Sequence, residues 1–442
     1  MAVQLRLRLG EQRATISWDA PAATPDVVQE QPTDGRQGLS AWDFSSLAQR
    51  IGEAFATDAD GNAVGSRAVA LLVDEHSPLV PLELLPRLPR RCLEAELEVI
   101  LSPAVLDASP CAVSELPVAM LRELGRALRA TAALSELAPP LRQLCQAVAG
   151  ALREVGWFRL VLDAADLAVV LRSRAAFDAF STTTEQRRKH HVVSKRSKFA
   201  GYAGQPRREF FQCRRLGAKV NEKALWPDAE FEAAAAAHLE LMHELGELCL
   251  LAALAGLGRE PGCVPPLWGG GPGAAAGEQL GDEEFGSGVL RLYRYTAADP
   301  GAAAKAAKPG VACGVHADLG LLSLSPTAST AGLTLLHGTK RIWMDVEAGC
   351  APEHCCVFGG ESLGRLTNGA IRAPLHFVDE RLALAAGVVR HSAPFFFRAR
   401  PEAVLAEGVT TAQFIEGEVF TSRPWRGNGA NGKGSSKPGS DY

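Results

Sequence analysis

The chain has 442 residues, of which 47% are hydrophobic and 22% are charged, and its formal net charge at pH 7 is −4. Such a composition is typical of a globular protein of two or three domains. The small net charge excludes a global electrostatic attraction to nucleic acid or to a membrane surface. No apolar run reaches the length that spans a bilayer, so we expect neither a nucleic-acid partner nor a membrane segment.

The N-terminus and the cysteines indicate a protein of the cytoplasm. Residues 1–9 alternate polar and apolar side chains and are soon followed by Glu11, a pattern that predicts a β-strand rather than a secretory leader. The ten cysteines include no CxxC pair and no regular spacing, so we expect reduced thiols rather than disulfide bonds or a zinc site. A reducing compartment would also help to keep an iron site ferrous.

Residues 1–135 contain no pattern that indicates chemistry. Apolar side chains at helical spacing predict helices over residues 40–55 and 118–134. A short apolar run predicts a buried strand over residues 69–73. We interpret this part of the chain as an N-terminal α/β extension of unknown role.

Residues 136–258 are predicted to be mainly helical. Amphipathic or Ala-rich periodicity indicates three helices, and short apolar runs indicate two strands between them. The glycines at positions 201 and 204 predict a break in the chain. The expected helices are residues 140–154, 166–180 and 228–256, and the expected strands are residues 157–161 and 209–212.

Strands dominate residues 289–405, after a Gly- and Pro-rich segment at 259–288 that predicts a flexible loop. Short apolar runs separated by Gly, Pro and Asn turns are typical of an antiparallel barrel or jelly roll. Residues 406–442 form a C-terminal segment with a low-complexity tail that predicts disorder. The expected strands are residues 289–295, 319–325, 333–337, 343–345, 355–358, 376–378, 387–391 and 394–398.

Three side chains in this region have the chemistry of a metal centre. His316 and Asp318 are alternate residues of an extended segment, so both point to the same side. His376 supplies a second imidazole from a distant strand. Two neutral nitrogens and one carboxylate oxygen are the ligand set of non-haem iron(II) oxygenases and do not form a closed zinc site. We predict that these three residues hold Fe(II).

A second set of side chains suits a cosubstrate. The open positions on such an iron accept a bidentate 2-oxo acid and O2, and the far carboxylate of the acid then needs a cationic partner. Arg390 and the hydroxyl of Ser392 alternate along one strand and provide that donor fork. The phenol of Tyr295 adds a hydrogen bond. His391 lies between Arg390 and Ser392 and points to the opposite side of the strand, so we do not predict it as a ligand.

Several segments occur in the order found in one enzyme superfamily. They are VGWFRLV (155–161), EQRRK (185–189), GYAG (201–204), LRLYRY (290–295), GVHADLGLLSL (314–324), GLTLLH (332–337), WMDV (343–346), GGESLGRLTNG (359–369) and RHS (390–392). Over roughly residues 138–405 the chain thereby resembles the 2-oxoglutarate- and iron(II)-dependent dioxygenases. The likeness is specifically to the isopenicillin N synthase-like branch of that superfamily.

The chain departs from this family pattern at several points. The usual Gly-Asp before the Thr-Asn-Gly segment is Gly360-Glu361, and the stretch from His376 to Arg390 is longer than usual. Gly- and Ala-rich segments are inserted at residues 260–288 and 296–310. None of these changes replaces a predicted metal ligand, but they leave the substrate unspecified.

The resemblance implies a mixed α+β fold in which a double-stranded β-helix (jelly roll) core is framed by helices. It also implies an oxidoreductase that uses Fe(II) and O2. Such an enzyme couples decarboxylation of 2-oxoglutarate, to succinate and CO2, to oxidation of a second, small-molecule substrate. Hydroxylation is the default outcome, and desaturation or ring closure is compatible with the same iron site. We expect a monomer.

Two alternatives stay open. The first is a catalytically silent family member that acts as a binding or scaffold protein. The intact ligand set argues against it, and Asp318→Ala distinguishes the two, because a scaffold keeps its biological effect without this carboxylate. The second is an enzyme that does not use 2-oxoglutarate, against which the pair of Arg390 and Ser392 argues weakly.

Overall fold

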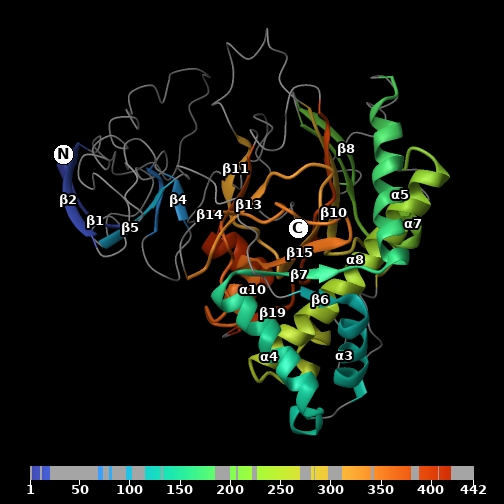
Figure 1. Ribbon diagram of the computed structural model, residues 1–442, viewed down its shortest axis with the longest axis horizontal. Helices are drawn as coiled ribbons and strands as arrows, with labels where there is room; N and C mark the ends of the chain where they lie inside the picture. The colour runs from blue at the N-terminus through green and yellow to red at the C-terminus, as the bar shows by residue number, and fades with distance from the viewer. Residues whose placement is uncertain are drawn as a thin grey trace. The chain divides into compact units, whose positions relative to one another are not determined.

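The computed structural model divides the chain into two compact units, residues 1–106 with 418–432 and residues 107–417 with 433–442 (Figure 1). The second unit begins near residue 107, ahead of the boundary predicted at residue 135, and the other predicted boundaries stay predictions. The structure describes residues 2–9, 12–19, 68–72, 79–81, 96–101, 115–130, 133–184, 200–205, 208–221, 226–268, 280–282, 284–296, 311–339, 343–379, 388–406 and 408–419.

The described strands of the first unit form one five-stranded sheet in the order β2-β1-β5-β3-β4. β1 pairs antiparallel with β2 along its whole length and parallel with β5. The strands predicted over residues 1–9 and 69–73 are confirmed, whereas the helix predicted over residues 40–55 lies outside the described residues. The strands are β1 (Ala2–Leu9), β2 (Gln12–Asp19), β3 (Ala68–Leu72), β4 (Leu79–Pro81) and β5 (Glu96–Leu101).

The larger sheet of the second unit has nine described strands. Its order is β6-β7-β15-β12-β18-β10-β9-β8, and β17 also pairs with β10. Most neighbours are antiparallel, as the turn-separated runs predicted. The strands are β6 (Glu115–Pro117), β7 (Trp157–Val161), β8 (Gly201–Gln205), β9 (Arg208–Cys213), β10 (Val289–Tyr295), β12 (Leu322–Pro326), β15 (His354–Gly359), β17 (Arg390–Ser392) and β18 (Phe395–Phe397).

A smaller, four-stranded sheet packs against one face of the larger one. Its order is β11-β16-β13-β14. Side chains of both sheets share one buried cluster, with Trp157 and Phe358 from the larger sheet and Leu335 and Met344 from the smaller. This arrangement is the jelly roll that the sequence predicted. The strands are β11 (Val311–His316), β13 (Leu333–Leu336), β14 (Trp343–Asp345) and β16 (His376–Asp379), and a separate hairpin joins β19 (Val404–Ala406) to β20 (Val409–Thr410).

Helices pack on the other face of the larger sheet. α8 contacts α3, α4 and α5 as well as β9, β12 and β18, and Figure 1 shows α3, α4 and α8 together below the strands. None of the helices in the described part of the chain is long and apolar enough to cross a membrane. The helices are α3 (Val118–Ala130), α4 (Pro139–Glu154), α5 (Ala164–Ser181), α7 (Ala218–Asn221), α8 (Ala229–Gly256), α10 (Glu361–Leu366) and α12 (Thr411–Gln413).

Local sequence explains where the central helix begins and how closely it packs. The carboxylate of Asp228 accepts a hydrogen bond from the backbone N–H of Phe231 and caps α8. In the middle of the helix, a Cβ added at Gly246 would lie 2.9 Å from Cγ of Phe397. Glycine at this position therefore lets α8 lie directly on β18.

Most predicted helices and strands of the second unit are confirmed, although β11 was not predicted and the strand predicted from residue 319 begins at Leu322. The break predicted at Gly201 and Gly204 is wrong, because these glycines belong to β8 and pair with Gln212 and Glu209 of β9. Backbone pairing with a neighbouring strand outweighs the low strand propensity of glycine. The space beside Gly204 is occupied by the ring of Tyr202, whose hydroxyl would lie 2.6 Å from an added Cβ.

Candidate metal centre and cosubstrate site

His316 and His376 lie directly opposite each other on adjacent strands. His316 is the last residue of β11 and His376 is the first residue of β16, and the two pair in register. Their ring centroids are 4.2 Å apart. Asp318 follows two residues after His316, beyond the end of β11. The chain bends only at residues 319–321, so the carboxylate lies between the end of β11 and this bend.

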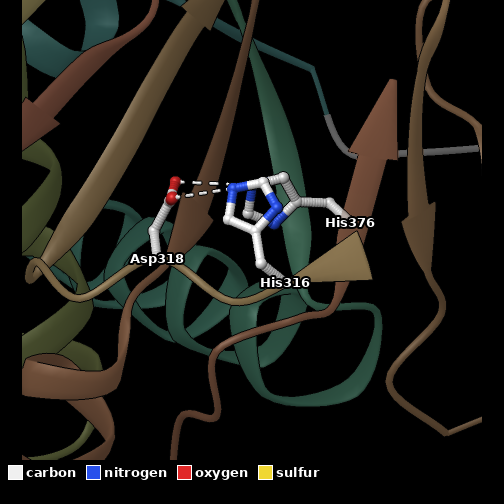
Figure 2. Close-up of side chains that lie close together, drawn as sticks. All are labelled: His316, Asp318 and His376. Atoms are coloured by element: carbon white, nitrogen blue, oxygen red, sulfur yellow. Dashed lines mark ion pairs between the residues drawn. The ribbon is translucent and has the colours of Figure 1, made fainter. Parts of the chain in front are cut away.

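The three predicted ligands converge, as Figure 2 shows. Nε2 of His316 is 3.6 Å from Oδ1 of Asp318, and Nε2 of His376 is 3.6 Å from Oδ2 of the same carboxylate. One ligand atom from each residue lies within 4.8 Å of the others. Three donors on one face of an octahedron with bonds of about 2.1 Å are roughly 3 Å apart. Two imidazoles and a carboxylate at these separations therefore fit a single iron(II) ion with open positions.

Neighbouring groups hold two of these side chains in place. The hydroxyl of Ser323 donates to Oδ2 of Asp318 at 2.5 Å. Nδ1 of His376 is 3.3 Å from the carbonyl oxygen of Pro374, and the ring packs against Phe358. A proton on Nδ1 leaves Nε2 as the metal-binding nitrogen. The side chains of Asp318 and His376 are each 7% exposed and that of His316 is 34% exposed, so the cluster opens to solvent on the His316 side.

Arg390 and Ser392 lie on β17, opposite Tyr295 and Tyr293 of β10. The Arg390 side chain is 2% exposed, and its guanidinium lies 5.4 Å from the centre of the Tyr295 ring. Its Nη1 is buried without a hydrogen-bond partner in the described part of the protein. Burial raises the pKa of Tyr295 above its ordinary value, so the phenol stays protonated. The predicted cosubstrate residues are thus brought together, and one buried donor among them is unsatisfied.

Glu347 forms a buried ion pair with Arg390 that the sequence did not indicate. Nη2 of Arg390 donates to both carboxylate oxygens, at 3.2 and 3.0 Å, while Nε donates to the carbonyl of Thr330. The same carboxylate accepts the backbone N–H groups of Ala328 and Leu333. No spacing rule links a residue after β14 to one in β17, so this pair is visible only in three dimensions.

Arg291 lies on the same face of β10 as Tyr293 and Tyr295 and was also missed. Its Nε donates to Oε1 of Gln212 at 2.7 Å, and its Nη1 donates to the Tyr293 hydroxyl at 3.2 Å. Burial opposes the charge of this guanidinium, but Tyr293 and the more distant Asp318 favour it, and the pKa of Arg291 is raised. Alternation along the strand marks this position as inward-facing once Tyr295 is assigned to the site.

His391 lies away from the cluster, as the alternation predicted. Its Nε2 is 2.9 Å from Oδ1 of Asp178 on α5, on the helical side of the sheet. The structure thus separates His391 from the two histidines of the candidate metal centre.

One curated protein with sequence similarity is a "2-oxoglutarate-Fe(II) type oxidoreductase" of Aspergillus fumigatus. It is 30% identical over 117 residues, which are 26% of this chain and 33% of that protein. The match therefore spans about a third of the length of the relative. No protein-family model matches the chain.

Solved structures share the fold over a longer stretch. A full-length protein of Neurospora crassa, solved in complex with alpha-KG, has a TM-score of 0.51 and 15% identity, and the match covers 69% of this chain and 90% of that one. The same protein solved with alpha-KG and 5-formyluracil has a TM-score of 0.50 and 15% identity, with 69% and 89% covered. The fold that the resemblance implies is confirmed. The structural match covers 69% of this chain, against 26% for the sequence match to the curated oxidoreductase.

Proposed function

We propose that the chain is a 2-oxoglutarate- and iron(II)-dependent oxygenase that oxidises a small-molecule substrate. The observation that carries this proposal is the convergence of His316, Asp318 and His376 on one point between the two sheets. The similarity to a curated 2-oxoglutarate–iron(II) oxidoreductase supports it independently. Bound iron, with 2-oxoglutarate and O2, would supply oxidative decarboxylation to succinate and CO2 coupled to oxidation of the second substrate.

The protein's own groups hold and orient the iron ligands. The Ser323 hydroxyl fixes the plane of the Asp318 carboxylate, and the carbonyl of Pro374 favours the tautomer of His376 whose Nε2 is free to bind iron. Because Asp318 and His376 are almost fully buried, water has little access to the metal from their side. A small substrate would approach from the more exposed side of His316.

Arg390, Ser392 and Tyr295 would bind the far carboxylate of 2-oxoglutarate. The unsatisfied Nη1 of Arg390 fits this group, because a buried N–H without a partner costs free energy that a bound carboxylate recovers. The protonated phenol of Tyr295, opposite Arg390 in register, donates a second hydrogen bond. Glu347 and Thr330 fix the guanidinium before the cosubstrate binds.

Anaerobic titration tests the proposal. Purified apo-protein is titrated first with Fe(II) and then with 2-oxoglutarate, and the visible metal-to-ligand charge-transfer absorption of the complex is recorded. We expect the band in the wild type. We expect no band in His376→Ala, and in Arg390→Gln we expect a loss of 2-oxoglutarate affinity of about a hundredfold, which corresponds to ~2.7 kcal/mol.

His391→Ala is the matched control. It removes a histidine next to Arg390, and this histidine contacts Asp178 rather than the candidate metal centre. It should give the wild-type titration. Iron binding without the band would exclude 2-oxoglutarate as the cosubstrate. A failure of the wild type to bind iron would favour the silent binding or scaffold protein.

A further inference from the structure

Arg291 is a charged side chain in the interior of the jelly roll without a carboxylate partner among the described residues. Its hydrogen bonds go to Gln212 and Tyr293, both uncharged at neutral pH. The guanidinium lies between two aromatic rings, 5.4 Å from the centre of Phe210 and 5.2 Å from that of Phe396. Its Nη2 forms no hydrogen bond to another described residue. Two nitrogens of the Arg291 guanidinium are thus held in place, and Nη2 is left to donate to a ligand.

Two other arginines of the same sheet form ion pairs. Arg390 pairs with Glu347, and Arg294, three residues along β10 on the opposite face, pairs with Glu209. A partly desolvated charge without a directly paired carboxylate is costly unless a ligand supplies one. The contrast with Arg390 and Arg294 therefore points to an anion that arrives from outside the chain.

The position of Arg291 relates it to the iron ligands. Phe396 of β18 lies beside β10 and is paired with Ser323 of β12, which in turn donates to Asp318. Adjacent strands are about 4.8 Å apart, so the backbone at Arg291 is on the order of 10 Å from that at Ser323. A small molecule bound to Arg291 can reach the metal centre from this distance.

The proposed cosubstrate anchor lies elsewhere on β10. Arg390 is opposite Tyr295, four residues along the strand from Arg291. That separation corresponds to roughly 13 Å of backbone. The far carboxylate of 2-oxoglutarate bound at Tyr295 therefore leaves Arg291 free for a second molecule.

We propose that Arg291 binds the carboxylate of the oxidised substrate, and that the apolar part of this substrate lies against Phe210 and Phe396. A single guanidinium with two of its nitrogens already engaged matches the single negative charge of a carboxylate. The substrate class is thus a small organic acid with an apolar, preferably aromatic body. This inference rests on the proposed function, because it assumes that iron and 2-oxoglutarate occupy the neighbouring positions.

The test compares acids with their uncharged amides. The anaerobic protein, loaded with Fe(II) and 2-oxoglutarate, is titrated with 4-fluorophenylacetate or 4-fluorophenylacetamide and followed by fluorine NMR. Hexanoate and hexanamide form a second pair, followed by proton NMR. We expect the wild type to bind at least one acid tenfold or more tightly than its amide, a difference of ~1.4 kcal/mol. Arg291→Gln should reduce this preference to less than twofold and leave the 2-oxoglutarate affinity unchanged.

Two variants control for charge and for folding. Arg291→Lys retains the cation and should keep part of the preference for the acid. Arg294→Gln removes an arginine from the same strand on its opposite face and should keep all of it. Loss of the preference in Arg294→Gln, or its full retention in Arg291→Gln, would contradict the assignment.

Three results would overturn the proposal in distinguishable ways. If the wild type shows no charge-transfer band, the proposed function itself fails. If the band is present but no acid binds better than its amide, only the substrate class is wrong. If Arg291→Gln weakens 2-oxoglutarate tenfold instead of the acid, the carboxylate at Arg291 belongs to the cosubstrate.

Discussion

The two faces of the nine-stranded sheet bury ionisable groups in different ways. On the face that packs against α8, His238 and His243 are almost fully buried, and burial lowers their pKa values to about 3 and about 4. On the inner face, Asp318 and Arg390 are equally buried but have partners or ligand roles. The helical side therefore keeps these two histidines neutral, whereas the inner side buries charged groups, which in our proposal bind ligands.

Three consecutive phenylalanines in β18 show this division most simply. Phe395 and Phe397 are fully buried and contact His243 of α8, whereas Phe396 between them contacts Arg291 on the inner face. The alternation of a strand places chemically identical residues in two environments. Their substitution should accordingly have different consequences.

The largest expected effect is that of Phe397→Ala, which should lower the free energy of unfolding of the apo-protein by about 4 kcal/mol. Phe397 is closely packed against Gly246 and Trp268, so its removal leaves a cavity. Urea denaturation measures the change. Phe396→Ala is the matched control and should cost less than half as much. Equal losses would show that the two faces contribute equally to stability.

Glu347→Gln is expected to cost about 3 kcal/mol of stability, although Glu347 lies on the inner side. The substitution leaves the buried charge of Arg390 uncompensated. Arg291→Gln should cost much less, because it breaks no ion pair. Urea denaturation of Glu347→Gln, of Arg390→Gln and of the double variant Glu347→Gln/Arg390→Gln measures the coupling. Arg291→Gln is the comparison.

If the stability losses of Glu347→Gln and Arg390→Gln add up to the loss of the double variant, the two side chains are not coupled. Arg390 would then owe its position to Thr330 and Tyr295 rather than to the carboxylate.

Much of the candidate site was predictable because strand periodicity and ligand chemistry act locally. Alternation assigned Arg390 and Ser392 to one face and His391 to the other, and the donor set alone selected His316, Asp318 and His376. Register was not predictable, so the pairing of His316 with His376 and of Arg390 with Tyr295 became evident only in the structure.

The features that were missed depend on contacts that form only when the chain folds. Glu347 meets Arg390 across 43 positions of sequence, and the Ser323 hydroxyl meets Asp318 because the chain turns after β11. Gly201 and Gly204 were predicted to interrupt the chain, but their backbone groups pair with β9. In each case a contact with another residue determines the conformation or the role, and the propensity of the single residue does not contain it.

The buried histidines of the helical face predict a pH dependence of stability. His238 has an ordinary pKa near 6.5 when unfolded but stays neutral in the folded protein to about pH 3, chiefly because of burial. Between these values the unfolded chain binds a proton that the folded protein does not. The free energy of unfolding therefore falls as the pH is lowered, by up to ~1.4 kcal/mol per pH unit for this group.

His238→Gln removes the titration and can still bond to Ser173. Between pH 6 and pH 4 we expect its free energy of unfolding, measured for the apo-protein in urea, to fall less steeply than that of the wild type. Parallel curves for the two proteins would show that His238 becomes protonated in the folded state.

The smallest expected effect concerns Ser323, on the inner face of the sheet. Ser323→Ala removes the hydrogen bond to Oδ2 of Asp318, so the carboxylate is no longer fixed in the plane that the metal requires. We expect about tenfold weaker Fe(II) binding, or ~1.4 kcal/mol, with little change in the unfolding of the apo-protein. Ser325→Ala, two residues along the same buried strand, is the control and should bind iron normally. If Ser323→Ala instead destabilises the apo-protein and leaves Fe(II) binding unchanged, the hydroxyl stabilises the fold rather than the metal site. The difference between the two faces would then not hold at Ser323.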